Sequence, residues 1–171
     1  MNKLRAITSI IGSVFILAFD KKLKVGLIID VPLLLITFYL IVRHRLKIAS
    51  WFRSWPVPKF LAAVISSLPF MLFEENMNCL PTGCRLIPPT IPILTIFIIA
   101  LLTLSNFLKV RSIKKPVIIF SIFGVILEMT YGASAAAFRA LPTSWLLFFV
   151  AWVFVSYAYV SVVPMVVLTE N

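Results

Sequence analysis

Residues 145–168 read WLLFFVAWVFVSYAYVSVVPMVVL, and this stretch contains no charged side chain. A helix needs about 20 apolar residues to cross the roughly 30 Å hydrocarbon core of a bilayer. The stretch shows no regular alternation of apolar and polar residues, which argues against a membrane-spanning β-strand. It therefore predicts a membrane-spanning helix near the end of the chain.

The composition of the whole chain agrees with this prediction. Of the 171 residues, 61% are hydrophobic and 13% are charged, and the mean hydropathy is +1.07. An ordinary soluble domain is about 45–50% apolar and about 25% charged. These values exclude a disordered chain, a disulfide-stabilised miniprotein and an ordinary water-soluble enzyme. We expect one all-α domain over residues 1–171, a polytopic bundle in a membrane.

Further apolar segments suit the same architecture, and they lie at 6–19, 25–42, 60–77, 91–108 and 116–132. Pro92 and Pro116 stand at the starts of their segments, where the missing amide proton costs nothing. The segment 6–19 is short for a span, so it either crosses the membrane or lies at its surface. The expectation is six transmembrane helices, with five as the alternative.

The basic residues predict the orientation of this bundle. Lys and Arg are dense in the segments 43–59 and 109–115, which two helices separate, so both segments lie on one side. The positive-inside rule assigns that side to the cytoplasm. Six helices then place both termini inside, in an integral protein of the plasma membrane with cytoplasmic basic loops. Three lysines between 20 and 25 fall outside, against the rule, and favour the five-helix alternative.

The net charge of +10 would suggest a nucleic-acid partner in a soluble protein. Here the cations lie between apolar runs, so membrane anchoring explains them and no nucleic-acid partner is expected. Trp51, Arg53 and Trp55 form an interfacial pattern suited to anionic lipid. The expected partners are membrane lipids, with other membrane subunits or a second copy of the chain as further options. No motif identifies a cofactor.

The acidic residues gather on the opposite side. Five of the six map to the outer half of the predicted bundle: Asp20, Asp30, Glu74, Glu75 and Glu128. A carboxylate at mid-helix in hydrocarbon costs about 2.5–3.5 kcal/mol on insertion scales, so these groups should face the bundle, a recess with water, or a cation. The pattern predicts an outward-facing acidic pocket. The alternative is simple pairing with the outer cations or exposure at the headgroups.

Glu128 is the strongest single candidate in this pocket. Ser121, Gly124 and Tyr131 share its helix face at spacings of three and four residues, and glycine allows a neighbouring helix to approach closely. Glu128 is therefore expected to be a functional acid or, alternatively, a buried hydrogen-bond donor between helices. Asp30, Ser121, Tyr131 and Arg139 are the residues expected to bind a substrate or an ion.

Glu74 and Glu75 are the other expected catalytic groups. Adjacent residues on a helix point about 100° apart, so only one of them can point directly into the bundle. Two close carboxylates favour one protonated and one ionised form, which places an acid beside a base. A hydrated helix end is the alternative reading of this pair.

Cys79 and Cys84 bracket the sequence Leu-Pro-Thr-Gly, which favours a turn. Both lie on the predicted oxidising side, so we expect a short structural disulfide, with a redox-active pair as the alternative. A metal site is not expected, because two thiolates do not complete a tetrahedral shell and the chain has one histidine.

Three functions fit these observations. The first is a membrane enzyme that acts on a lipid-soluble substrate by carboxylate acid–base chemistry. The second is a small transporter or channel in which the same acids bind a proton or a cation. The third is a non-catalytic subunit of a membrane complex whose acids are merely paired.

Overall fold

The computed structural model describes residues 31–79, 90–131 and 143–169, with the side chains of 77–79 and 143–145 left aside. The regular secondary structure of these residues is entirely helical and consists of α3 (Val31–Arg53), α4 (Lys59–Cys79), α5 (Ile91–Phe107), α6 (Lys114–Thr130) and α8 (Thr143–Thr169). The predicted helix bundle is thus confirmed for this part of the chain. The expected helix at 6–19 lies outside the described residues.

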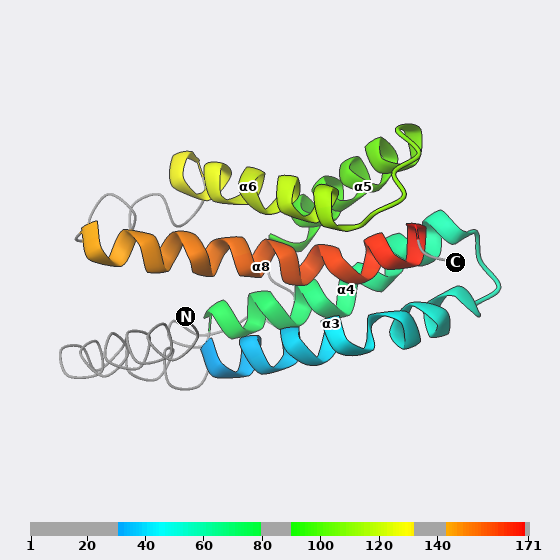
Figure 1. Ribbon diagram of the computed structural model, residues 1–171, viewed down its shortest axis with the longest axis horizontal. Coiled ribbons are helices and arrows are strands. Elements are labelled where there is room, and N and C mark those ends of the chain that lie inside the picture. Colours follow the sequence, from blue (N-terminus) through cyan, green and yellow to red (C-terminus); the bar gives the residue numbers. More distant parts are fainter. Residues whose placement is uncertain (1–30, 80–89, 132–142, 170–171) are drawn as a thin grey trace.

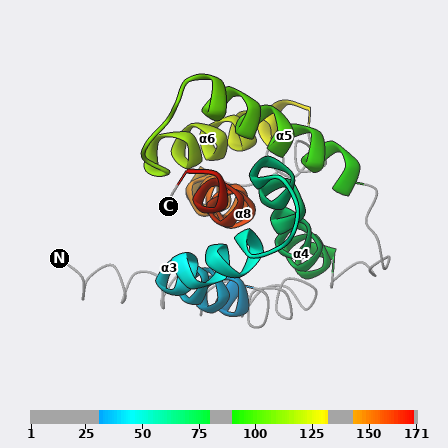
Figure 2. The ribbon, with the colours of Figure 1, turned by 90° about the vertical axis from the view of Figure 1, so that its right-hand side faces the viewer.

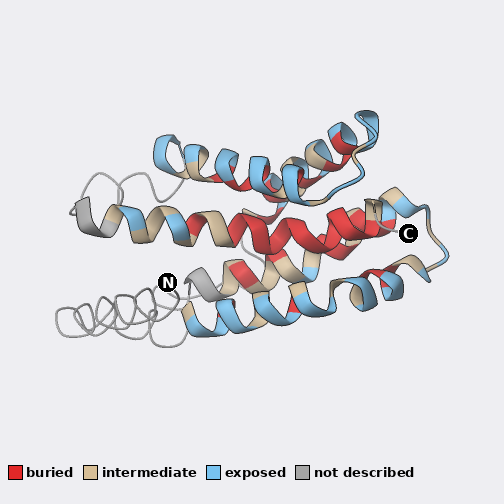
Figure 3. Cartoon of the chain, in the orientation of Figure 1, coloured by how far each residue is buried: buried red, intermediate tan, exposed pale blue. Residues whose placement is uncertain are grey.

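Helix α8 forms the centre of the bundle, and the other four helices surround it (Figures 1 and 2). It packs most extensively against α4 and α6, and also against α3. Nearly every side chain between Val153 and Val167 is buried, on all faces of the helix (Figure 3). This burial explains why the sequence of α8 is apolar on all sides. A helix that exposes no side to water does not need a row of polar residues along one face.

The helices place charges of opposite sign at opposite ends of the bundle. The α3–α4 connection, the α5–α6 connection and the end of α8 lie together at one end, on the right of Figure 1. We call this the basic end and define it by residues 43–59 and 108–115. Glu74 and Glu128 lie near the other ends of α4 and α6. The predicted common side of the two basic segments therefore agrees with the observed arrangement.

One boundary differs clearly from the prediction. The segment 43–59 was expected to be a loop, but α3 continues through it as far as Arg53. Its residues are mostly good or neutral helix formers, and no glycine or proline interrupts them before Pro56. Proline disfavours helical conformation in the residue before it. The helix therefore ends just before Pro56 and Pro58, and not at Arg43, where the apolar run ends.

The outer faces of the surrounding helices carry large apolar side chains. Exposed examples are Leu35 and Ile36 of α3, Ile93 and Ile96 of α5, and Ile119 and Ile122 of α6. Figure 3 shows the same exposed surface along α3, α5 and α6. Contiguous apolar surface of this kind is rare on soluble monomers and indicates contact with a membrane or another protein.

Among the described helices, one segment is both long and apolar enough to cross a membrane by length and composition, namely Leu146–Thr169 of α8. Helix α5 is a shorter apolar helix of 17 residues. The length and composition of this one helix indicate membrane association only weakly, because the core helix of a soluble protein can be equally long and apolar.

Candidate functional site

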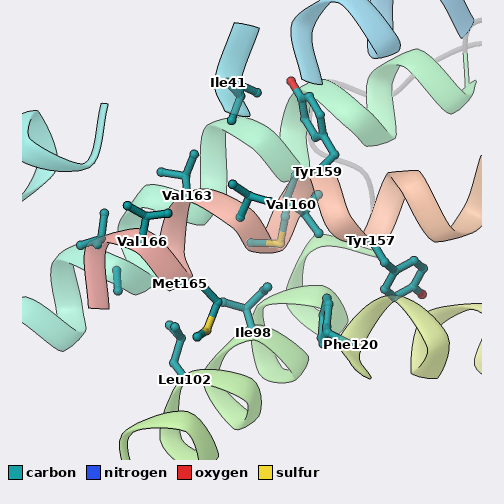
Figure 4. Close-up of a cluster of buried hydrophobic side chains, with 14 of the residues drawn as sticks. Ile41, Ile98, Leu102, Phe120, Tyr157, Tyr159, Val160, Val163, Met165 and Val166 are labelled. Carbon is teal, nitrogen blue, oxygen red and sulfur yellow. The ribbon is translucent and has the colours of Figure 1, made fainter. Parts of the chain in front are cut away.

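The best-defined polar contact between helices joins α6 and α8. Tyr157, which is 8% exposed, donates its hydroxyl proton to Oε1 of Glu128 across 3.4 Å. Its ring also lies 5.5 Å from that of Phe120, centroid to centroid, and Figure 4 shows both rings at the contact of α6 with α8. A buried tyrosine needs a partner for its hydroxyl group, and Glu128 supplies it.

Gly124 makes this contact possible. It lies on the face of α6 that meets α8, one turn before Glu128, and it is buried. A Cβ atom at this position would overlap the ring of Tyr157. The absence of a side chain therefore lets the tyrosine ring lie against the α6 backbone, with its hydroxyl group level with Glu128.

We expect Gly124→Ala to destabilise the protein. In an open helix this change adds about 0.5–1 kcal/mol of stability, whereas overpacking a filled site costs about 1–3 kcal/mol. The apparent midpoint of thermal unfolding in detergent should therefore fall. Adding Tyr157→Ala should remove the overlap, so the double variant should lose less than the sum of the single losses. Additive losses would contradict the contact.

The two glutamates of α4 approach the same place. Glu74 is buried, with 6% of its surface exposed, and Glu75 is partly buried. The carboxylates of Glu74, Glu75 and Glu128 lie towards the same end of the bundle and within electrostatic range of the Tyr157 hydroxyl group. We call Glu74, Glu75, Glu128 and Tyr157 the acidic cluster. The structure thus brings together the three residues that the sequence predicts as catalytic.

Two buried hydroxyl groups accompany the acidic cluster. Thr90 Oγ1, just before α5, is buried close to the carboxylate of Glu75. Ser156 Oγ on α8 is buried without a hydrogen-bond partner. On a helix Ser156 points between Tyr157 and Tyr159, and the charge of Glu74 acts on both of these tyrosines. Both hydroxyl groups could therefore form hydrogen bonds with a polar group that is bound among the carboxylates.

Tyr159 fixes the other side of α8. Its ring packs against Phe38 of α3 and against Phe70 and Phe73 of α4, with centroid distances of 6.3, 5.9 and 6.0 Å. These contacts hold α3 and α4 against α8 at the level of the acidic cluster. Large aromatic contacts of this kind restrict the rotation of α8 and keep Tyr157 directed at α6.

The remaining predicted site residues lie elsewhere or outside the described part. Ser121 is fully buried, but its hydroxyl group donates to the backbone oxygen of Val117 at 2.8 Å. Tyr131 follows the last residue of α6 and is 90% exposed, so it does not share the buried face of Glu128 as expected. Asp30 and Arg139 lie outside the described residues.

The expected disulfide also lies outside what the structure describes. Cys79 ends α4 with an undescribed side chain, and Cys84 falls in the segment 80–89. The disulfide stays a prediction. Among the described residues, no three His, Cys, Asp or Glu side chains are close enough to hold a metal ion.

Tyr157 is the one member of the acidic cluster that the sequence does not single out. Helix α8 is apolar all round, so no polar face draws attention to this residue. A tyrosine near the middle of an otherwise apolar helix is the sequence signal that could have drawn attention to it. Chemically, the cluster combines groups that can donate and accept protons with a phenol that can orient one of them.

Comparison with protein-family models, with curated proteins and with solved structures finds no match for this chain. Its function is therefore inferred from the geometry of the acidic cluster and from the surface of the bundle.

Proposed function

We propose that the chain is an integral protein of the plasma membrane with six helices across the bilayer, or five if residues 6–19 lie at the surface. The apolar outer faces of α3, α5 and α6 support this proposal. A soluble bundle of this size would expose a patch of a few hundred Å² at most, whereas lipid favours apolar residues on the whole outer surface.

The charges at the two ends of the bundle support the orientation. The basic end would face the cytoplasm, since cytoplasmic loops carry an excess of Lys and Arg. The acidic cluster would then lie towards the outer surface. On this placement the C-terminal end of α8 is cytoplasmic, and with six helices the N-terminus is cytoplasmic too.

We infer that the acidic cluster is the active site of a membrane enzyme that transfers protons to and from a lipid-soluble substrate. The observation that carries this proposal is the hydrogen bond from Tyr157 of α8 to Glu128 of α6, with the buried Glu74 of α4 at the same end of the bundle. Carboxylates of this kind can serve as the general acid and the general base of a proton-transfer reaction. Tyr157 would orient Glu128, and a substrate dissolved in the bilayer would reach the cluster laterally.

A second candidate function uses the same residues to bind a cation or a proton during transport. The buried carboxylate of Glu74 and the Tyr157–Glu128 hydrogen bond support it, because ionisable residues inside membrane helices often mark the path of a proton or an ion. A third reading, a non-catalytic subunit of a membrane complex, is supported by the exposed apolar faces, which another subunit could cover.

The test compares two assays on the full chain in membranes. Mass spectrometry of the lipid-soluble fraction would detect substrate conversion, and a pH-sensitive dye inside proteoliposomes would detect proton flux under a Na⁺ or K⁺ gradient. Conversion without flux supports the enzyme, and flux without conversion supports the transporter. Neither activity, with a correctly folded chain, contradicts both and favours the subunit.

Tyr157→Phe should lower whichever activity is found by about tenfold, or about 1.4 kcal/mol of activation free energy, because Glu128 then loses the hydroxyl group that orients it. The ring and its packing against Gly124 are kept, so thermal stability should change little. Tyr131→Phe is the matched control, since it removes the same hydroxyl group from an exposed residue at the same end. Equal effects of the two variants would contradict the role of Tyr157.

A further inference from the structure

A row of polar and aromatic side chains follows the outer face of α3 into the basic end. Tyr39, Arg43, Lys47 and Trp51 are spaced by four residues, and all four are exposed. Residues four apart lie above one another on a helix, so they form one continuous stripe. We call these four residues the α3 stripe.

The charges of the α3 stripe are not balanced by acids. Helix α3 contains no acidic residue, and within the described part of the chain neither Arg43 nor Lys47 forms an ion pair. In the described part of the chain, one hydrogen bond joins side chains of the stripe, and it is internal: Arg43 Nη1 donates to the Tyr39 hydroxyl oxygen at 3.2 Å. Two exposed cations about one helical turn apart are therefore available to an anion.

Trp51 closes the stripe and is held in place by its neighbours. Its ring packs edge-on against Phe52 and Trp55, with centroid distances of 4.8 and 5.0 Å. It nevertheless remains 57% exposed. A fixed, half-exposed indole beside cations is typical of a residue at the headgroup level of a bilayer, where its apolar body and polar N–H are both satisfied.

The other end of the stripe continues into apolar surface. Leu35 lies one turn before Tyr39 on the same face and is 46% exposed, and Ile36 beside it is 57% exposed. A ligand that follows this face meets hydrocarbon-like side chains first, then a phenol, then two cations and an indole. That order matches acyl chains followed by a glycerol backbone and a phosphate.

We propose that the α3 stripe binds an anionic phospholipid, with the lipid phosphate between Arg43 and Lys47 and the acyl chains along Leu35 and Ile36. The proposal rests on the membrane placement proposed above, and it is independent of what the acidic cluster does. The guanidinium group of Arg43 can bind two phosphate oxygens at once, while Lys47 adds a point charge.

The test reconstitutes the full chain in phosphatidylcholine liposomes that contain a small fraction of spin-labelled phosphatidylglycerol. Electron paramagnetic resonance measures how strongly the labelled lipid associates with the protein relative to labelled phosphatidylcholine. The wild-type chain should prefer phosphatidylglycerol. In the variant with Arg43→Gln and Lys47→Gln, the affinity for phosphatidylglycerol relative to phosphatidylcholine should fall by about fivefold for each cation removed. Added salt should lower the same relative affinity in the wild type.

The matched control carries Lys114→Gln and Lys115→Gln, which remove the same charge from two exposed residues of α6 at the basic end. It should keep most of the preference, and an equal loss in both variants would overturn the α3 stripe as a site. Arg43→Lys should keep part of the preference, which separates loss of charge from loss of fold. Displacement of the lipid by inorganic phosphate at equal concentration would assign the site to a soluble anion instead.

The failure of this proposal can be told apart from the failure of the membrane placement. A wild-type chain that does not float with neutral liposomes contradicts both. A chain that floats but shows no preference for phosphatidylglycerol contradicts the lipid site alone.

Discussion

Glu128→Gln should reduce the activity of the protein by about 10²–10⁴-fold, which is the usual contribution of a general acid or base. Glutamine has nearly the same shape as glutamate, and its side-chain oxygen can still accept the proton of the Tyr157 hydroxyl group. It cannot take up or release a proton at neutral pH. The packing of α6 on α8 should therefore survive while proton transfer at this position is lost.

The measurement is the conversion or flux assay described above, made together with thermal unfolding of each variant in detergent. Thr130→Gln is the control, because it introduces the same side chain into an exposed position of α6 two residues away. It should leave the activity unchanged. Full activity of Glu128→Gln in a folded chain would show that Glu128 transfers no proton in the reaction, and the assignment of the active site to the acidic cluster would be wrong.

The helices of this bundle could be predicted from the sequence because each one coincides with an apolar run. Their ends were harder to place. The hydropathy of α3 falls at Arg43, but the helix ends ten residues later because its backbone meets no helix-breaking residue before Pro56. An apolar run therefore predicts which part of a helix is removed from water. The end of the helix depends instead on helix-breaking residues such as proline.

The acidic cluster could also be predicted only in part from the sequence. The positions of the glutamates along their helices were enough to predict that Glu74, Glu75 and Glu128 lie at the same end. The role of Tyr157 depends on the rotation of α8 about its own axis, which an all-apolar sequence does not specify. Tyr131 does not share that face because α6 ends at Thr130, and the backbone of Tyr131 has already left the helical conformation.

Ile122→Lys should prevent stable insertion of the chain into membranes. Ile122 lies at the middle of α6 and is 48% exposed on its outer side. If that side faces lipid, a lysine at the helix centre costs about 2.5–3.5 kcal/mol on insertion scales. If the same side faced water, the substitution would stay within about 0.5 kcal/mol and would improve solubility. The two environments therefore predict opposite results for one substitution.

Phe107→Lys is the matched control for this experiment. Phe107 ends α5 near the basic end and is 80% exposed, so a lysine there can extend its ammonium group to the headgroup region while its alkyl stem stays apolar. The amount of chain that resists carbonate extraction from membranes should fall sharply for Ile122→Lys and stay near the wild-type level for Phe107→Lys. Equal extraction resistance of Ile122→Lys and the wild type would mean that the outer face of α6 does not meet hydrocarbon. The outer face of α6 would then have to be covered by another protein subunit, and it would no longer support contact with lipid.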